Sequence, residues 1–430
     1  MRAYHVRSGN ESADSWRGSL AKDVEGGDPA NSMSAALQQG AAPRKSGPSI
    51  AVLRFANLAE DPTQQHLSDG ITEDIITELS RYRELFVIAR SSSFSFRGRN
   101  IPTSEIGRIL GAVYMADGSL RKLGNRIRVS VQLVEAGTSR QIWAERYDRE
   151  LEDIFAIQDE IARTIAVTLV GHIERSHLEQ TRRKPTSSWA AYDYVLQARQ
   201  CVDHYDTKAA KDLLGRAIAL DPGYANAHAM LAWAGMQQFF DDTREETLNT
   251  CLACAERALS LDDNDFFCHC AMGLVLTFCK RFDAAELHLD RAVALNPNST
   301  LAAVPRAQWM SRVGRTREAL RVLDMVALRD PLLPPWYWEC RSGPLFTEKE
   351  YEEMIRTMNR KSPLQYYDHA HLAAAYAYLG RDAEARAEAA EVLRMKPGFS
   401  IWTYAKQEPF KEPADLEHLL VGFRKAGLPD

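Results

Sequence analysis

The sequence lacks a long uncharged apolar run. No stretch of its 430 residues approaches the about 18 apolar residues that a membrane-spanning helix needs, and residues 1–48 contain no apolar core of a signal peptide. A strong charge of one sign is also missing, because 53 basic residues stand against 58 acidic ones and leave a formal net charge of -5. Without a global basic field, we expect no nucleic-acid and no membrane partner. These absences predict a cytoplasmic protein.

Motifs of common enzyme classes are missing as well. The sequence contains no Gly-x-Ser-x-Gly, no phosphate-binding P-loop, no His-Glu-x-x-His and no protein-kinase set, and its 11 histidines show no ligand spacing. A nucleophilic triad, a phosphate cradle and a zinc-peptidase centre are therefore not predicted. We expect a protein that is not an enzyme and that carries neither cofactor nor metal.

Disulfide bonds are not expected either. The seven cysteines are odd in number and lie in helix-like sequence, as free thiols of a reducing compartment do. Cys251 and Cys254, followed by Cys268, His269 and Cys270, offer enough soft donors for a tetrahedral zinc site. Their spacing is poor, since Cys268 and Cys270 point to different faces of one helix. Packing thiols are the simpler interpretation.

Residues 1–48 are rich in serine, glycine, alanine, asparagine and aspartate, and they show neither a helical nor a strand period. Such a segment buries too little apolar surface to offset an ordering entropy of about 1–2 kcal/mol per residue. We predict a disordered N-terminal tail over 1–48.

An α/β domain is predicted over residues 49–180. Ile50–Leu53 and Phe86–Ala89 are short apolar runs typical of strands that are buried on both faces. Apolar residues at helical spacing follow each run, and Gly111 stands where a left-handed cap would end the second helix. These segments predict the order strand, helix, strand, helix along the chain.

The remainder of this domain changes period. Ile127–Leu133 alternates apolar and polar residues after a Gly124-Asn125 turn signal, which predicts a hairpin with one solvated face. A further strand over Gln141–Tyr147 and an amphipathic helix over Ile154–Leu169 follow. A linker is predicted over 181–187, where three basic residues precede a proline. They could touch nucleic acid, but a solvated joint explains them more simply.

Beyond residue 188 strand signals end and a repeat begins. A motif typical of a helix end recurs, in which an alanine and a leucine are followed by Asp or Asn, and related Asp-Pro and Lys-Pro ends continue the series. The last residues of these motifs are Pro222, Asp263, Pro297, Pro331 and Pro397. The steps between these residues are 41, 34, 34 and 66. A period of about 34 is the signature of tetratricopeptide repeats. An all-α tetratricopeptide-repeat solenoid of about five to six repeats is therefore predicted over 188–430, with about seven extra residues in its second repeat.

The chain resembles a bacterial family in which a TolB- or FlgO-like α/β domain precedes tetratricopeptide repeats, commonly behind a class III adenylate/guanylate cyclase domain or a winged-helix regulator. The segments that carry the resemblance are Ser49–Phe55, Asp69–Ile75, Phe86–Ser91, Trp143–Asp148, Pro413–His418 and Arg424–Pro429. Arg54 departs from the family, which usually has proline there. The resemblance implies an α+β fold class, with a TolB-like α/β domain followed by the solenoid.

Regulation and interaction are what the resemblance implies for function. The chain is expected to be a non-catalytic regulatory or scaffold protein that binds a protein partner through the repeat groove, in bacterial cyclic-nucleotide or transcriptional control. Only 48 low-complexity residues precede Ser49, which is too few for a cyclase fold. The alternative is therefore the regulatory C-terminal part of a class III adenylate cyclase that lacks its catalytic domain. A small-molecule sensor in the α/β domain is a third hypothesis.

Two segments of the α/β domain are candidate ligand sites. Asp69–Asp74 fits a metal or phosphate loop, but three acidic groups near a helix start also suit the helix dipole, and capping by Ser68 and Asp69 is our interpretation. Arg90–Ser93 follows a strand's carboxyl end, where α/β sheets bind ligands. It lacks a glycine-rich cradle, so a small-molecule ligand there is not the main expectation.

The candidate partner-binding residues are Trp336, Tyr337 and Trp338. Aromatic side chains dominate the energetics of protein interfaces, which favours a hot spot here. The three residues also lie in the least regular repeat, over 331–346, which contains four prolines. Filling the core of that degenerate repeat explains them equally well.

Overall fold

The computed structural model describes residues 48–58, 64–96, 101–170, 186 and 188–430. Met1–Lys45 and Ser46–Asp430 separate into two units, and every residue described below belongs to the second. The predicted tail over 1–48 and the predicted linker over 181–187 lie almost entirely outside the described residues. None of the described helices combines the length and the apolar character that crossing a bilayer requires.

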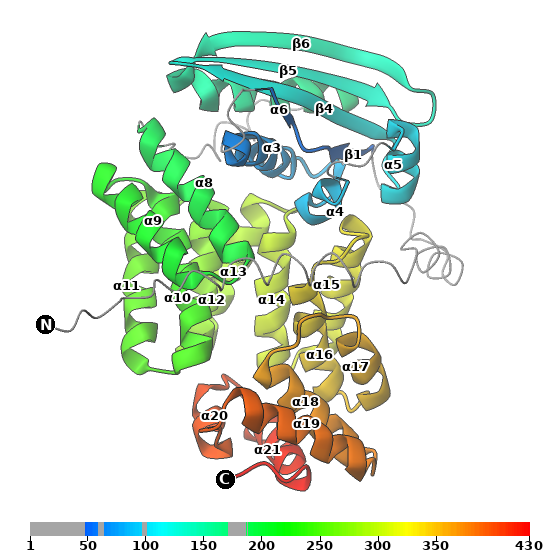
Figure 1. The fold of residues 1–430 in the computed structure, drawn as a ribbon, viewed down its shortest axis with the longest axis vertical. Helices are drawn as coiled ribbons and strands as arrows, with labels where there is room; N and C mark the ends of the chain where they lie inside the picture. The colour runs from blue at the N-terminus through cyan, green and yellow to red at the C-terminus, as the bar shows by residue number, and fades with distance from the viewer. Residues whose placement is uncertain (1–47, 59–63, 97–100, 171–185, 187) are drawn as a thin grey trace, which may run out of the picture. The chain divides into compact units, whose positions relative to one another are not determined.

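A mixed sheet occupies the first part of the described chain (Figure 1). Its strands, in spatial order, are β3 (Phe86–Val87), β1 (Ser49–Val52), β4 (Tyr114–Leu123), β5 (Arg126–Glu135) and β6 (Arg140–Glu150), with the short β2 (Ala56–Asn57) beside β4. The pairs β1–β3 and β1–β4 are parallel, whereas β4–β5 and β5–β6 are antiparallel. The parallel part is the one that the β-α-β-α order predicts, and the antiparallel part contains the predicted hairpin, in which Gly124 has a φ of 60°.

Helices cover both faces of this sheet. They are α3 (Gln65–Leu79), α4 (Arg90–Phe94), α5 (Thr103–Leu110) and α6 (Ile154–Val170), with a 3-10 turn, η2 (Leu151–Asp153), ahead of α6. Leu67, Ile71 and Ile75 recur every fourth residue along α3 and join the alternating apolar residues of β5 and the buried face of α6 in one core. Helix α5 packs on the other face and ends at Gly111, whose φ of 63° confirms the predicted left-handed cap.

The predicted capping role of Ser68 and Asp69 is wrong. Helix α3 begins four residues earlier than expected for a helix capped there, at Gln65, because Leu67 supplies an additional core contact. Ser68 and Asp69 consequently lie inside the helix and are buried, as are Glu73 and Asp74. Asp69 is paired with Arg54, and the two side chains form a two-point ion pair.

The remaining described chain is all helical, as predicted, and forms six consecutive antiparallel helix pairs followed by a seventh, shorter one. The helices are α8 (Trp189–Asp203), α9 (Thr207–Leu220), α10 (Ala225–Asp242), α11 (Glu245–Leu261), α12 (Phe266–Phe278), α13 (Phe282–Leu295), α14 (Thr300–Arg312), α15 (Thr316–Arg329), α16 (Pro335–Thr347), α17 (Tyr351–Met358), α18 (Tyr366–Tyr378), α19 (Asp382–Met395), α20 (Ile401–Gln407) and α21 (Pro413–Lys425). We call α8, α10, α12, α14, α16, α18 and α20 the first helices of their pairs. Each of the six pairs is a helical hairpin of the tetratricopeptide type.

The repeated Asp or Asn motif ends the second helix of its pair, as its pattern predicts. Ala217, Ala258 and Ala292 are fully buried where the two helices of a pair approach, and each carbonyl accepts the N–H of the residue that ends its helix. The predicted insertion in the second repeat is distributed over two helices. Helices α10 and α11 have 18 and 17 residues, whereas α12 and α13 have 13 and 14.

The segment 331–346 is more regular than its four prolines suggest. Pro335 occupies the first position of α16, where a missing N–H costs nothing because that group has no helical partner. Pro344 lies inside the same helix. The aromatic run 336–338 therefore forms the first turn of an ordinary first helix.

Close packing of α21 on α18 leads to a first prediction. A Cβ atom on Gly422 would lie 2.7 Å from the Cβ of Ala374, which has no torsion that could move it away. Gly422→Val is expected to force the two helices apart and to lower the free energy of unfolding by about 1–3 kcal/mol, measured by urea denaturation. The exposed Gly215 is the control, because a Cβ atom there would have no other atom within 4 Å. Gly215→Ala should instead raise stability by about 0.5–1 kcal/mol, and a harmless Gly422→Val would contradict the packing.

Candidate functional site between the sheet and the repeats

Three of the acidic residues of α3 face the first repeat helix, α8. Asp69 and Glu73 are four residues apart and therefore share one side of the helix, with Asp74 next to them. The guanidinium of Arg199, on α8, lies 3.3 Å from the Glu73 carboxylate and 3.8 Å from that of Asp74. Arg199 is only 15% exposed. This buried charge cluster joins the sheet to the repeats.

A polar cluster next to it ties a third helix to the same place. The Tyr192 hydroxyl, on α8, donates a hydrogen bond to Asp74. Gln158, on α6, donates from Nε2 to Asp74 at 3.2 Å and to the Tyr192 oxygen at 3.1 Å. Burial and the neighbouring Asp74 carboxylate hold the pKa of Tyr192 well above its usual value, so this phenol stays a hydrogen-bond donor.

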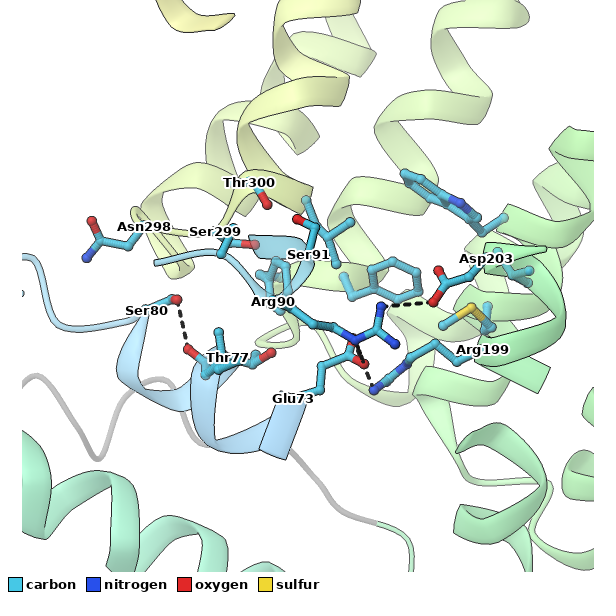
Figure 2. Close-up of a pocket in the computed structure, with 18 of the residues that line it drawn as sticks. Glu73, Thr77, Ser80, Arg90, Ser91, Arg199, Asp203, Asn298, Ser299 and Thr300 are labelled. Carbon is cyan, nitrogen blue, oxygen red and sulfur yellow. Dashed lines mark hydrogen bonds and ion pairs between the residues drawn. The ribbon is translucent and has the colours of Figure 1, made fainter. Parts of the chain in front are cut away.

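Arg90 connects the end of β3 to the same cluster. Its guanidinium lies 2.9 Å from the Glu73 carboxylate and 2.8 Å from that of Asp203, on α8, and it stacks 4.9 Å from the centre of the Phe94 ring. Figure 2 shows Glu73 close to both Arg90 and Arg199, with Asp203 beside Arg90. Arg90 belongs to the segment that we predicted as a weak ligand site, and two carboxylates of the chain already engage it.

Two of the three serines of that segment also bind the chain itself. Ser91 and Ser92 donate hydrogen bonds to the carboxylate of Asp330, which ends α15, and the N–H of Leu332 donates to Ser92 Oγ at 2.7 Å. Asp330 is fully buried, and this burial raises its pKa although the two hydroxyls lower it. The Asp-Pro motif of a repeat thus serves as an anchor for the sheet domain.

A second repeat end makes a similar contact. The Nδ2 atom of Asn296, which ends α13, donates to the carbonyl of Thr77 at 3.1 Å. Asn298 donates from Nδ2 to the Tyr82 carbonyl at 2.7 Å and from its backbone N–H to the Ser80 carbonyl at 3.1 Å. Two successive repeat ends therefore hold α3 and α4 against the helical array.

A cavity of about 150 Å³ lies inside this contact, and we call it the interdomain pocket (Figure 2). Its walls come from α3, the end of β3 and α4 on one side, and from the first helices α8, α10, α12, α14 and α16 on the other. Apolar walls are provided by Met230, Trp233, Phe266, Phe267 and Trp336. Charged and polar groups from both sides converge on them, which is the composition of a small-molecule site.

Asn226, near the start of α10, is the unusual member of this lining. Its side chain is 7% exposed, and among the described residues its Oδ1 atom has no hydrogen-bond partner. A buried acceptor without a partner costs about 1–3 kcal/mol, so a group that binds it gains correspondingly. Sequence reasoning missed Asn226, because a single asparagine in a helix is common and carries no signal.

The three aromatic residues predicted as a hot spot have different environments. Tyr337 is 1% exposed and donates its hydroxyl to the Leu323 carbonyl at 2.9 Å, so it is part of the core. Trp336 is half-buried and lines the interdomain pocket, whereas Trp338 is half-buried beneath the guanidinium of Arg360, 5.0 Å from the ring. The partner-binding role of these residues stays a prediction.

A second cavity, of about 130 Å³, lies toward the C-terminus, and we call it the C-terminal groove. Its lining comes from the first helices α10, α12, α14, α16, α18 and α20 and the turns next to them, with no residue of the sheet among those described. The Tyr366 hydroxyl closes it at one point by donating to the Phe240 carbonyl at 3.0 Å. It is the part of the array's first-helix side that the sheet leaves open.

The candidate zinc donors are packed inside two helix pairs. Cys251 and Cys254 lie on α11, and Cys268 and Cys270 lie on α12, where both are fully buried. Burial raises the pKa of the Cys251 thiol to about 12. Over the described ranges no group of three or more histidine, cysteine or acidic side chains has the arrangement of a metal site.

Comparison with known proteins gives one relative in sequence and several similar structures. No family model matches the chain. A Rhizobium meliloti (strain 1021) protein called "Putative adenylate cyclase 3" is 39% identical over 245 residues, which are 56% of this chain and 42% of the relative. The chain thus spans less than half the length of that protein.

The similar solved structures share little sequence. PilF of Pseudomonas aeruginosa is 18% identical with a TM-score of 0.35, covering 50% of this chain and 95% of PilF. A tetratricopeptide repeat protein from Parabacteroides merdae ATCC 43184 is 13% identical with a TM-score of 0.33, covering 55% of this chain and all of the other. At these TM-scores the likeness carries no conclusion about function.

Proposed function

We propose that this chain is a non-catalytic regulatory protein that binds a protein partner through the C-terminal groove. The observation that carries the proposal is the division of the repeat array. Its N-terminal first helices are occupied by the chain's own sheet domain, whereas the groove formed farther along has no such occupant among the described residues. Helical repeats use this kind of extended surface to bind other proteins.

The lining of the groove favours a basic partner segment. Three carboxylates line it, those of Glu339, Asp368 and Glu408, against one cation, the guanidinium of Arg312. Lys361 lies 2.9 Å from Glu339 and 2.5 Å from Asp368, and Arg312 lies 2.8 Å from Glu408. Among the lining residues the carboxylates therefore outnumber the cations, which attracts a cation.

Aromatic rings in the same groove support this preference. Tyr367 is half-buried, and its ring already holds the Lys361 ammonium 5.2 Å from its centre, while Lys396 lies 4.3 Å from the centre of the Tyr366 ring. Tyrosine faces bind ammonium and guanidinium groups. An extended peptide that carries lysine or arginine next to an apolar residue is therefore the partner segment that fits.

The binding test uses the 430-residue chain and peptides selected against it from a random displayed library, measured by calorimetry. We expect the selected peptides to be basic. Gln407→Lys, which adds a positive charge to the groove, should weaken them at least about tenfold. The same change at the exposed Gln141 of β6 is the matched control and should leave affinity unchanged. Equal affinity for both variants, or selection of acidic peptides, would refute the proposal that the C-terminal groove binds a basic partner segment.

The proposed setting is bacterial signalling, with the sheet domain as a TolB- or FlgO-like docking unit. Support comes from the segments that resemble that family, among them Asp69–Ile75 and Phe86–Ser91, which form the contact with the repeats. Cyclic-nucleotide or transcriptional control by a cytoplasmic protein is the corresponding role. In this proposal the anchored sheet domain fixes the position of the groove relative to whatever the sheet domain contacts.

A second candidate is the regulatory part of a class III adenylate cyclase. The supporting observation is the 39% identity to the Rhizobium meliloti protein, more than half of which has no counterpart in the alignment. The test adds this chain to the unmatched part of that protein and measures cyclic AMP formed from ATP. A rate that changes at least about twofold and saturates with the chain would favour this candidate. An unchanged rate would exclude it.

A further inference from the structure

We propose that the interdomain pocket binds an uncharged, planar nitrogen heterocycle of the nucleobase or nucleoside class, held at its edge by the side-chain amide of Asn226. This site is separate from the C-terminal groove and does not depend on the function proposed for it. Its ligand would contact the sheet domain and the repeats at once.

The amide of Asn226 selects the edge of the ligand. A carboxamide offers one acceptor and two donors side by side, which matches a ring edge where a donor and an acceptor are neighbours. Adenine presents such an edge, and asparagine binds it through two hydrogen bonds in protein complexes with DNA. Within the described chain the Oδ1 atom has no other partner, so the ligand's donor would satisfy it.

The aromatic walls select a flat ring. The Trp233 and Phe267 rings lie 5.5 Å apart with their planes inclined by 36°, and Phe267 is 6% exposed. Trp336 and Met230 complete the apolar lining. Stacking of a base on aromatic side chains is worth about 1–3 kcal/mol per base and tolerates different bases. An aliphatic ligand would gain burial here but not this stacking.

The charges of the pocket argue against a phosphate group. Two cations, Arg90 and Arg199, and two anions, Glu73 and Asp203, line it. Each cation is already paired, with Arg90 2.9 Å from Glu73 and 2.8 Å from Asp203 and Arg199 3.3 Å from Glu73. A phosphate would have to displace these carboxylates from Arg90 and would then lie beside them, which is unfavourable between like charges. The pocket therefore favours neutral bases and nucleosides over their phosphates.

Binding would strengthen the contact between the sheet domain and the repeats. The lining on one side comes from α3 and α4, and on the other from α10, α12 and α16. A ligand that binds this folded arrangement and not the unfolded chain stabilises it, by about 2.7 kcal/mol at a free concentration 100 times its Kd. The melting temperature should consequently rise with ligand concentration.

The test measures the melting temperature and binding heat of the 430-residue chain with adenine, adenosine, guanosine, cyclic AMP and ATP. We expect adenine or adenosine to bind, and cyclic AMP and ATP to bind at least about tenfold more weakly. Asn226→Ala should lose at least about tenfold in affinity while the free protein is as stable as before or more stable, because an unsatisfied group is removed. Asn359→Ala, at an exposed helix end, is the matched control and should bind like the parent.

Three outcomes would overturn the proposal. They are no binding of any base or nucleoside up to millimolar concentration, equal affinity for the parent and the Asn226→Ala variant, and tighter binding of the phosphorylated compounds. The last outcome would assign the pocket to nucleotides through Arg90 instead of to neutral heterocycles. A Trp233→Ala variant removes the stacking wall and leaves Asn226 unchanged. Weaker binding by this variant, with its fold intact by circular dichroism, is an independent confirmation that the heterocycle occupies this cavity.

Discussion

Arg199→Met is expected to lower the free energy of unfolding by about 3–5 kcal/mol, the usual cost of removing one partner of a buried ion pair. The guanidinium stands between Glu73 and Asp74, at 3.3 Å and 3.8 Å, and is 15% exposed. Methionine fills a similar volume but leaves these carboxylates without their common cation. The measurement is urea denaturation followed by circular dichroism.

Two further variants separate the lost charge pair from general damage to a helix. Arg356→Met changes an arginine that is 65% exposed and pairs with Glu353, and it should cost less than about 0.5 kcal/mol. Arg199→Met combined with Asp74→Asn should recover part of the loss, because Glu73 keeps its ion pair with Arg90, whereas the Asp74 carboxylate loses the cation that faces it. A loss below about 1 kcal/mol for Arg199→Met would mean that water reaches the cluster and screens it.

Asp330→Ala is expected to cost about 3 kcal/mol, because it removes the acceptor of two hydrogen bonds to a buried charged group. The variant also frees α4, since Ser91 and Ser92 lose their link to the repeats. Amide hydrogen exchange in Arg90–Phe94 should therefore accelerate. Asp262→Ala is the control, as Asp262 ends α11 and accepts the N–H of Asn264 at 3.0 Å within its own turn. It should cost about 1 kcal/mol, with exchange in α4 unchanged.

The pH dependence of this anchor follows from the raised pKa of Asp330. Burial lifts it above the ordinary value of 3.8, so the folded protein holds the proton more tightly than the unfolded chain. The protonated Asp330 side chain therefore contributes fully to the free energy of unfolding below pH 3.8. This contribution is lost as the pH rises through the higher pKa of the folded state. Relative to Asp330→Asn, the parent should lose stability as the pH rises above about 4. A stability difference that grows toward acid in favour of the variant would contradict the raised pKa.

Local patterns of sequence predicted the local structure well. The Asp and Asn motifs indicated the ends of α9, α11, α13 and α15, and the Gly124-Asn125 signal indicated the hairpin, because both depend on residues close in the chain. The interpretation of the acidic segment Asp69–Asp74 as capping is wrong because the partners of these residues are distant in the chain. Its partners include Arg54, Arg90 and Arg199, and a charge inside a helix is explained only by residues from other elements.

The site was predicted only in part. Arg90–Ser93 was a candidate from its place after a strand, and it does line the contact between the two parts of the chain. Its partner Asp330 lies 239 residues from Ser91, and no local pattern indicates such a pairing. Asn226 acquires its importance only from burial, which the sequence does not reveal. Tyr337 fills the core, as one of the two open interpretations has it, and Trp336 lines the interdomain pocket, while the partner-binding role stays a prediction.

The anchoring of two successive repeat ends limits how this array can change in length. Asn296 and Asp330 lie one repeat apart, and each binds a fixed point on the sheet domain. An extra helix pair inserted between them would move one anchor by a full repeat and break its hydrogen bonds, whereas a pair added after α19 would leave both in place. Repeat arrays usually tolerate additions throughout. In this chain the two anchors fix the number of helix pairs from α8 to α15, whereas pairs added after α19 would not disturb them.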